Sequence, residues 1–545
     1  MSAQLTSLLR RAQSGALRNS LIVMGGFILS RLTGLLRDVI ASFFFGTSAE
    51  AAAYRSAFTI VDLLYLVIIG GALGSSFIPV FIEVWERDGQ ARAWRLASAV
   101  VSWALVTLAA ASAVIFVAAP WLVQALYGGQ DFDEATLALT AQLTRLFLLS
   151  PLLLGLGGLA MAALNARDSF TLPALAPSVY NLGIIGGALL APWLGIWGMA
   201  WGVVVGALLY LLVQLPGLRA IGMKLQPHLG RGMEEVARVA RQMGPRVVGQ
   251  AAAHLSIVVT FTLAARLEDG AAKLAGLGYA YGLMMLPYGI FSLSLSQVAF
   301  PRLARLVAEG RTAELAADVR RTLGTILWLT LPSAAALLAL GLPLTRALYE
   351  RGAFDPLSLQ YTVSALAGYA AALPAFAASE ILIRSFYAMQ RTWTPVLVGL
   401  LQVGINLGLG TFLLRAGNDV AALALAFSFA NNVEALLLLA LLGAALPGIW
   451  RDGPLWRTVA CSALAACVLG LSLAALSAAS REVVPALTAA HPYHWLRDLP
   501  LLLGWLALAV ALGAAGYLGL TALLGVAPAR AFLRRLRTEK GEGRG

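Results

Sequence analysis

The chain has 545 residues, of which 59% are hydrophobic and only 12% are charged. Soluble domains carry about 25% charged residues, and a soluble chain of this length would divide into domains joined by polar linkers. Apolar stretches of roughly 20 residues instead recur from one end to the other, and each can cross a bilayer as a helix. This composition excludes a soluble enzyme, a nucleic-acid-binding protein and a secreted disulfide scaffold. It predicts a polytopic membrane protein, whose net charge of +12 reflects basic cytoplasmic loops.

The apolar stretches predict an all-α fold with about fourteen transmembrane helices. The first begins after a basic segment and is too long for a signal peptide, so we interpret it as a membrane span. The predicted spans are residues 18–46, 51–82, 94–124, 137–164, 171–192, 194–217, 235–266, 274–300, 320–345, 358–388, 394–414, 419–446, 455–479 and 497–525.

Basic residues divide unequally between the two sides of the membrane that this count defines. The side that holds both chain ends collects 26 Lys and Arg residues, and the other side collects 8. Lys and Arg gather in cytoplasmic loops, so the richer side is expected to be cytoplasmic. We therefore predict a multi-pass protein of the bacterial inner membrane with both termini in the cytoplasm and with the 128–136 and 481–496 loops outside.

The sequence contains an internal repeat. The motif Ala-Leu-Tyr, followed five residues after its tyrosine by Phe-Asp, occurs at 125–133 and again 222 residues later at 347–355. Pro79 and Pro301 have the same offset, and each is expected to break or end its helix, because proline removes a backbone donor. Six spans therefore repeat as the next six with the same orientation, and two spans follow. Parallel repeats of this kind are typical of transporters, which place the substrate between them.

This organisation predicts four segments. Residues 1–222 form an N-lobe of six helices and residues 223–446 a C-lobe of six more. Residues 447–527 form two added helices, and residues 528–545 a basic cytoplasmic tail.

The first span carries three charged residues, Arg31, Arg37 and Asp38, within an apolar sequence. An ionisable group at the bilayer centre costs about 2.5–3.5 kcal/mol on insertion scales, so each is a candidate functional residue. Arg31 and Asp38 share a helix face, and Gly34 between them leaves room above the backbone. Either these charges line a hydrated cavity, or Arg31 and Asp38 form an internal ion pair that only fixes helix packing. In the first case, an excess of guanidinium groups suits an anionic ligand, phosphate in particular.

Other charges inside predicted spans are Asp62, Arg246, Glu380 and Arg384. Glu380 and Arg384 have the i, i+4 spacing of a helical ion pair, and a structural pair is the favoured interpretation for them. Asp62 is a candidate proton or cation site. The chain shows neither metal-ligand spacing nor a phosphate-binding glycine loop, so we expect no metal, no cofactor and no ATP hydrolysis.

Several motifs resemble the MurJ/MviN family of lipid II flippases, which belongs to the multidrug/oligosaccharidyl-lipid/polysaccharide exporter superfamily. The resemblance runs in order from about residue 18 to 440. It is carried by SRLTGLLRD at 30–38, GGALGSSFIPVF at 70–81, LNARDSFTLPALAPSVYNLGII at 164–185, LPYGIFSLSLSQVAFPRLARL at 286–306, RGAFD at 351–355 and FYAMQRTWTPV at 386–396.

The resemblance implies a flippase, not an enzyme, that moves a polyprenyl-pyrophosphate-linked peptidoglycan precursor by alternating access and works as a monomer among membrane lipids. It implies that Arg31 and Arg37 engage the pyrophosphate beside Asp38, and that the two added helices form an apolar groove for the lipid tail. Ala52, Tyr65, Tyr281 and Thr260 occupy positions where family members carry charges. Two alternatives therefore remain: an exporter of another lipid-linked oligosaccharide or small molecule, and a degenerate homologue without transport activity.

Overall fold

The computed structural model of this chain describes residues 2–68, 72–129, 132–224, 228–230, 232–417, 419–450 and 453–542. Within these residues the secondary structure is helical and includes no strand, as expected for an all-α protein. The first half contains α1 (Ser2–Phe45), α2 (Ala49–Ile68), α3 (Ala72–Asp88), α4 (Gln90–Tyr127), α5 (Glu134–Phe147), α6 (Leu149–Ala166), α7 (Thr171–Leu189), α8 (Ala191–Leu194), α9 (Ile196–Leu212), α10 (Leu215–Ala220) and α11 (Glu234–Ala264).

The second half is helical in the same way. Its helices are α12 (Gly270–Pro287), the π-helix η1 (Tyr288–Leu293), α13 (Ser294–Ala308), α14 (Thr312–Tyr349), α15 (Pro356–Ala388), α16 (Trp393–Arg415), α17 (Val420–Ala445), α18 (Gly453–Ala479), the 3₁₀-helix η2 (Pro485–Leu487), α19 (Trp495–Leu523) and α20 (Ala527–Glu542).

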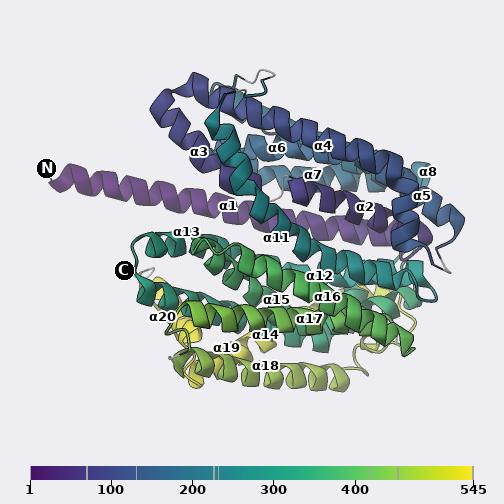
Figure 1. Ribbon diagram of the computed structural model, residues 1–545. Coiled ribbons are helices and arrows are strands. Elements are labelled where there is room, and N and C mark those ends of the chain that lie inside the picture. Colours follow the sequence, from purple (N-terminus) through teal and green to yellow (C-terminus); the bar gives the residue numbers. More distant parts are fainter. Residues whose placement is uncertain are drawn as a thin grey trace. The chain divides into compact units, whose positions relative to one another are not determined.

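The chain forms two compact units, residues 1–258 and 259–545, and the boundary lies within α11 (Figure 1). In the first unit α7 packs against both α1 and α9, and α2 packs against α5. In the second unit α15 packs against α12, α14 and α17. The predicted lobe boundary at residue 222 stays a prediction.

Eleven stretches of described helix are long and apolar enough to cross a membrane. They correspond to all the predicted spans except 18–46, 51–82 and 235–266, so the count of fourteen is not confirmed. The chain is helical in these three regions too, as α1, as α2 and α3, and as α11. The fold is therefore that of a multi-pass helical membrane protein.

The repeated motif folds twice into the same local structure. Helices α4 and α14 each have 38 residues and end at the tyrosine of the motif. The ring of Tyr127 lies 5.9 Å from that of Phe132, and the ring of Tyr349 lies 5.7 Å from that of Phe354. We call residues 124–133 the first repeat turn and residues 346–355 the second repeat turn. The sequence repeat is therefore confirmed at this point of each half.

The helix that follows each repeat turn begins with the same kind of cap. Asp133 accepts a hydrogen bond from the backbone N–H of Thr136 at 2.8 Å, and Asp355 accepts one from that of Ser358 at 2.7 Å. A side-chain oxygen at this position satisfies an N–H group that the first helical turn leaves without a partner. The two aspartates thus fix the first residues of α5 and α15.

The expectation for Pro79 and Pro301 was wrong. Each is the eighth residue of its helix, α3 and α13 respectively, and the helix continues on both sides of it. Proline removes one backbone donor, and a helix that is packed on its neighbours tolerates this as a local kink. The matching positions still agree with the repeat.

Glycines bring the first-unit helices around α7 into direct backbone contact. A Cβ atom at Gly183 of α7 would lie 2.3 Å from the Cα of Gly206 of α9. Only glycine, which has no Cβ, avoids this clash. A Cβ at Gly26 of α1 would lie 2.5 Å from the carbonyl oxygen of Ala174 of α7. Small residues of this kind allow membrane helices to approach closely. These contacts hold α7 between α1 and α9, and so position its side chains against both.

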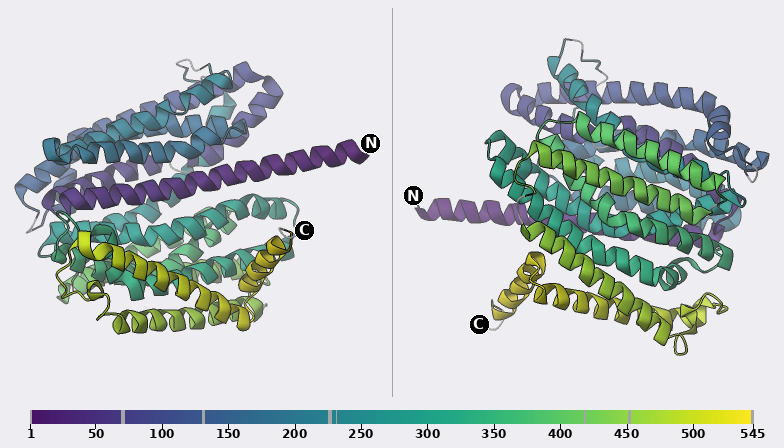
Figure 2. Two further views of the ribbon diagram at one scale, coloured as in Figure 1. Left: turned by 180° about the vertical axis from the view of Figure 1, so that it is seen from behind. Right: turned by 60° about the horizontal axis from the view of Figure 1, so that its bottom comes forward.

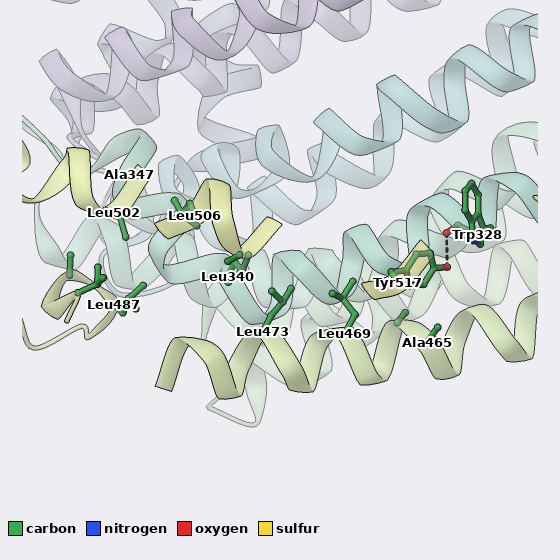
Figure 3. Packing of buried hydrophobic residues seen from close by; sticks show 14 of the residues in the cluster. Trp328, Leu340, Ala347, Ala465, Leu469, Leu473, Leu487, Leu502, Leu506 and Tyr517 are labelled. Atoms are coloured by element: carbon green, nitrogen blue, oxygen red, sulfur yellow. Dashed lines mark hydrogen bonds between the residues drawn. The ribbon is translucent and has the colours of Figure 1, made fainter. Parts of the chain in front are cut away.

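The two added helices pack on α14 through an apolar cluster (Figure 3). Leu469 and Leu473 of α18 and Leu506 of α19 belong to this cluster. The hydroxyl of Tyr517 donates to the carbonyl oxygen of Trp328 at 2.7 Å, which ties α19 to α14. Figure 2 shows α18 and α19 side by side, and α20 turning away from α19.

Candidate functional site

Arg37 and Asp38 form an ion pair within α1. The Nε and Nη2 atoms of Arg37 donate to Oδ1 of Asp38 at 3.0 Å and 2.9 Å, and both side chains are partly buried. Neighbours in sequence do not face each other on a helix, so the long arginine side chain folds back to reach Asp38. The positive charge of Arg37 is therefore balanced by the negative charge of Asp38.

Asn181 of α7 completes this cluster. Its Oδ1 accepts a bond from Nη1 of Arg37 at 3.2 Å, and its Nδ2 donates to the carbonyl oxygen of Ser30 at 3.1 Å and to the hydroxyl of Thr33 at 3.2 Å. One amide thus orients the guanidinium and joins it to the preceding turns of α1. A guanidinium has five N–H donors, of which these contacts use three. Among the described residues, two donors therefore remain for an anionic ligand.

The other first-helix candidates lie beside the cluster. A Cβ at Gly34 would lie 3.6 Å from Nδ2 of Asn181, which is an ordinary van der Waals contact, so the amide packs beside this glycine. Arg31 lies on the same helix with a partly exposed side chain. Arg246 belongs to α11, but its side chain lies outside the part of the chain that the structure describes.

Asp62 lies in the same unit, on α2. Its Oδ2 atom is 3.7 Å from Nε2 of His254 on α11, and 41% of its side chain is exposed. Asp62 also interacts electrostatically with Arg37. The structure therefore brings four predicted residues, Gly34, Arg37, Asp38 and Asp62, into one part of the first unit.

Glu380 and Arg384 form the helical ion pair that their spacing predicted. Nε of Arg384 donates to Oε1 of Glu380 at 2.8 Å. The hydroxyl of Tyr288, in the π-helix η1, donates to Oε2 of the same carboxylate at 2.8 Å. Both oxygens of Glu380 are thus satisfied within the second unit. This favours a structural role for the pair, while a role in substrate binding stays a prediction.

Within the described residues, no group of three or more His, Cys, Asp or Glu side chains is placed to hold a metal ion. The two cysteines, Cys461 and Cys467, are both free.

Sequence reasoning missed Asn181 and Tyr288. Asn181 is an amide in an otherwise apolar span and lies inside one of the quoted motifs, and these two signals together could have marked it. Tyr288 also lies inside a quoted motif, but its residue type gave no signal, because tyrosines are common near membrane interfaces.

Comparisons with known proteins bear on both sequence and fold. The family model of the lipid II flippase MurJ matches residues 40–488. A lipid II flippase MurJ of Burkholderia cenocepacia is 32% identical over 449 residues, which are 80% of this chain and 85% of that protein. A probable lipid II flippase MurJ of Bdellovibrio bacteriovorus is 28% identical over 451 residues, or 81% of this chain and 84% of that protein.

Solved structures give the same result for the fold. A lipid II flippase MurJ in an inward closed conformation matches with a TM-score of 0.72 at 22% identity, covering 92% of this chain and 98% of that one. An inward-facing multidrug resistance MATE family transporter of the MOP superfamily matches with a TM-score of 0.63 at 12% identity, covering 80% of this chain and 99% of that one. At these identities the likeness concerns the fold alone.

Proposed function

The chain belongs to the lipid II flippase MurJ family, and on this premise we propose that it translocates lipid II across the cytoplasmic membrane by alternating access. Lipid II is a polyprenyl-pyrophosphate-linked peptidoglycan precursor. The family match over residues 40–488 and the multi-pass helical fold support this function. They place the protein among transporters and not among enzymes.

The observation that carries the proposal is the oriented guanidinium of Arg37. Asp38 and Asn181 hold it from two sides, and two of its N–H donors stay available among the described residues. Arginine presents its donors as a planar fork that matches phosphate oxygens. We assign the pyrophosphate contact to Arg37 together with Arg31, and a positioning role to Asp38 and Gly34.

The remaining candidates complete the proposed cavity. Arg246 would add cationic charge from α11, and Glu380 with Arg384 would border the substrate from α15. Asp62 would face a different part of the substrate, because its charge has the wrong sign for phosphate. Residues 1–222 and 223–446 would act as the two lobes, and residues 447–527 would hold the lipid tail.

The proposed arrangement has both termini in the cytoplasm and a monomer as the functional unit. The bias of 26 basic residues against 8 supports this orientation. Reporter fusions in the 128–136 and 481–496 loops should respond only to reagents outside the cell. Labelling of either loop from the cytoplasm would contradict the orientation.

The test of the phosphate contact compares Arg37→Lys, Arg37→Ala and the double variant Arg37→Ala, Asp38→Ala. We expect Arg37→Lys to lose transport of labelled lipid II in proteoliposomes nearly as fully as Arg37→Ala, because an ammonium lacks the guanidinium fork. The double variant should stay inactive even though it leaves no unpaired charge. Matched amounts of folded protein in the vesicles are the control.

Two outcomes would remove Arg37 from the substrate site. One is wild-type transport by Arg37→Lys, and the other is recovery of transport in the double variant. Complementation of cells depleted of their essential lipid II flippase then tests the substrate itself, since a same-fold exporter of another lipid would not restore growth.

A further inference from the structure

The first unit contains a cavity of about 260 Å³ whose eleven lining residues include five aromatic side chains. Phe58 and Tyr65 come from α2, and Phe147 comes from the end of α5. Tyr180 comes from α7 and Tyr210 from α9. Five rings from four helices therefore line one half-open cavity.

Asp62 is the carboxylate in this lining. The lining residues Phe58, Val61, Asp62 and Tyr65 follow one another at the spacing of a single helix face, so α2 presents its acid between two aromatic rings. The side chain of Asp62 is 41% exposed, which leaves its oxygens accessible from the cavity.

The surroundings of Asp62 leave it incompletely satisfied. Among the described residues its ion-pair contact is with His254, at 3.7 Å, which is beyond hydrogen-bond distance, and Arg37 adds an electrostatic attraction without a direct hydrogen bond. A carboxylate inside a membrane protein is costly unless a partner compensates its charge. Asp38, by contrast, accepts two hydrogen bonds from Arg37 at 3.0 Å or less. The geometry around Asp62 therefore has room for a further cation.

The chemistry of the lining selects the kind of cation. Hard metal ions such as Ca²⁺ take about six to eight oxygen ligands, mainly carboxylates, carbonyls and waters. The side chains of this lining offer one carboxylate, and their other oxygens are the hydroxyls of Ser150 and the three tyrosines. The faces of tyrosine and phenylalanine attract alkylammonium groups, and cages of such rings recognise quaternary ammonium ligands. A carboxylate within an aromatic cage combines both attractions.

We propose that this cavity is a binding site for an alkylammonium group, with Asp62 as the counter-charge and Tyr65, Tyr180 and Tyr210 as the aromatic cage. The group is either part of the transported headgroup or a free amine. The site does not depend on the proposed phosphate contact of Arg37, because its residues and the sign of its charge differ.

The test measures thermal unfolding of the purified full-length protein with tetramethylammonium chloride replacing potassium chloride at constant ionic strength. A ligand that binds only the folded state raises the melting temperature, here by about 2 °C at saturating concentration. We expect this rise in the wild type and its loss in Asp62→Asn. Glu434→Gln is the matched control, because it removes one acid from α17 in the other unit and should keep the rise.

Tyr65→Leu provides a second variant that keeps the carboxylate. Loss of one ring from the cage should raise the tetramethylammonium concentration needed for half of the shift by roughly tenfold. This variant decides the question if Asp62→Asn fails to fold, which its melting curve in potassium chloride reveals. An unchanged wild-type melting temperature in the two salts, or an undiminished shift in Asp62→Asn or Tyr65→Leu, overturns the proposal.

A final titration distinguishes the two sources of the ammonium group. Saturating lipid II should abolish the tetramethylammonium shift if the transported headgroup carries the ammonium to this site. An undiminished shift in the presence of lipid II assigns the site to a free amine. Either result leaves the proposed site in place, and the preceding measurements need no transport activity, so failure of the proposed function and failure of this site are distinguishable.

Discussion

The two repeat turns share the same local structure but differ in several side chains. In both, a long helix ends at a tyrosine, a phenylalanine packs on that tyrosine, and an aspartate caps the next helix. The first repeat turn has Gln124 and Gly128 where the second has Arg346 and Glu350. Gln124 is exposed, whereas Arg346 is almost completely buried, at 1%.

The buried arginine of the second repeat turn holds a distant segment of the chain. Arg346 pairs with Glu350, and its Nη1 atom donates to the carbonyl oxygens of Ala486 at 2.8 Å and Thr488 at 2.7 Å. Tyr493 places its ring 5.3 Å from the guanidinium. The loop between α18 and α19 is thereby fastened to the end of α14. The duplicated turn thus kept its local structure, and its second copy serves as the attachment point of the added helices.

The largest expected effect comes from Arg346→Ala. Removing one partner of a buried ion pair leaves Glu350 and three carbonyl groups without their donor, so the free energy of unfolding should fall by about 3–5 kcal/mol. Unfolding of the detergent-solubilised protein measures the loss. Gln124→Ala is the matched control in the first repeat turn and should change stability by about 0.5 kcal/mol or less. Equal losses in the two variants would contradict the proposed difference between the turns.

A smaller effect is expected from a third ring, which packs on the second repeat turn from α12. Tyr279 of α12 lies 5.0 Å from Tyr349 and 5.5 Å from Phe354, measured between ring centroids. Ala57 is the first-half residue at the same offset. Tyr279→Leu keeps an apolar group but removes these ring contacts, which should lower the free energy of unfolding by about 1–2 kcal/mol. Thermal unfolding measures the change, and wild-type stability would show that the third ring adds nothing.

Removal of the capping aspartate should lower stability in both turns. Asp355→Ala removes the cap of α15 and should cost about 1 kcal/mol of stability. Asp133→Ala should act in the same direction on α5. Asp133 gives a further check, because hydrogen bonds from Thr136 lower the pKa of its carboxyl. Its contribution should be present above the usual aspartate pKa and be lost as the pH falls, and a stability difference between wild type and Asp133→Ala that did not shrink in acid would contradict the cap.

The smallest effect is the pH dependence of Glu350. Burial raises the pKa of this carboxyl, and Arg346 opposes the shift only in part. A raised pKa in the folded state means that the contribution of Glu350 is fully present below its ordinary pKa and is lost as the pH rises through the raised value. Stability should therefore fall less in Glu350→Gln than in the wild type as the pH rises above the ordinary glutamate pKa. Parallel pH profiles of the two proteins would show that Glu350 does not titrate differently on folding.

Much of the site could be predicted from the sequence, because charges stand out in apolar segments. Arg37 and Asp38 were found because an ionisable residue inside a span needs a reason to be there. The pairing of Glu380 with Arg384 followed from their i, i+4 spacing and is confirmed. The family resemblance seen in the motifs is also confirmed, by the match over residues 40–488.

The sequence by itself determined the properties that depend on local chemistry. Hydropathy over some 20 residues decides that a segment prefers the bilayer. A capping aspartate, Asp133 for α5 and Asp355 for α15, fixes where each of these helices begins. These free energies belong to the segment itself, so the multi-pass helical fold and the internal repeat could be predicted without knowing any contact between helices.

Only the tertiary structure decided which side chains meet. Asn181 reaches Arg37 across 144 positions of sequence, and Arg346 reaches Ala486 across 140. Such contacts depend on which helix faces pack together, and in a membrane small residues such as Gly26 and Gly183 set that packing through close backbone approach. Because many arrangements of apolar helices satisfy the same hydropathy pattern, the partners of each buried polar group follow from the packing and not from the pattern.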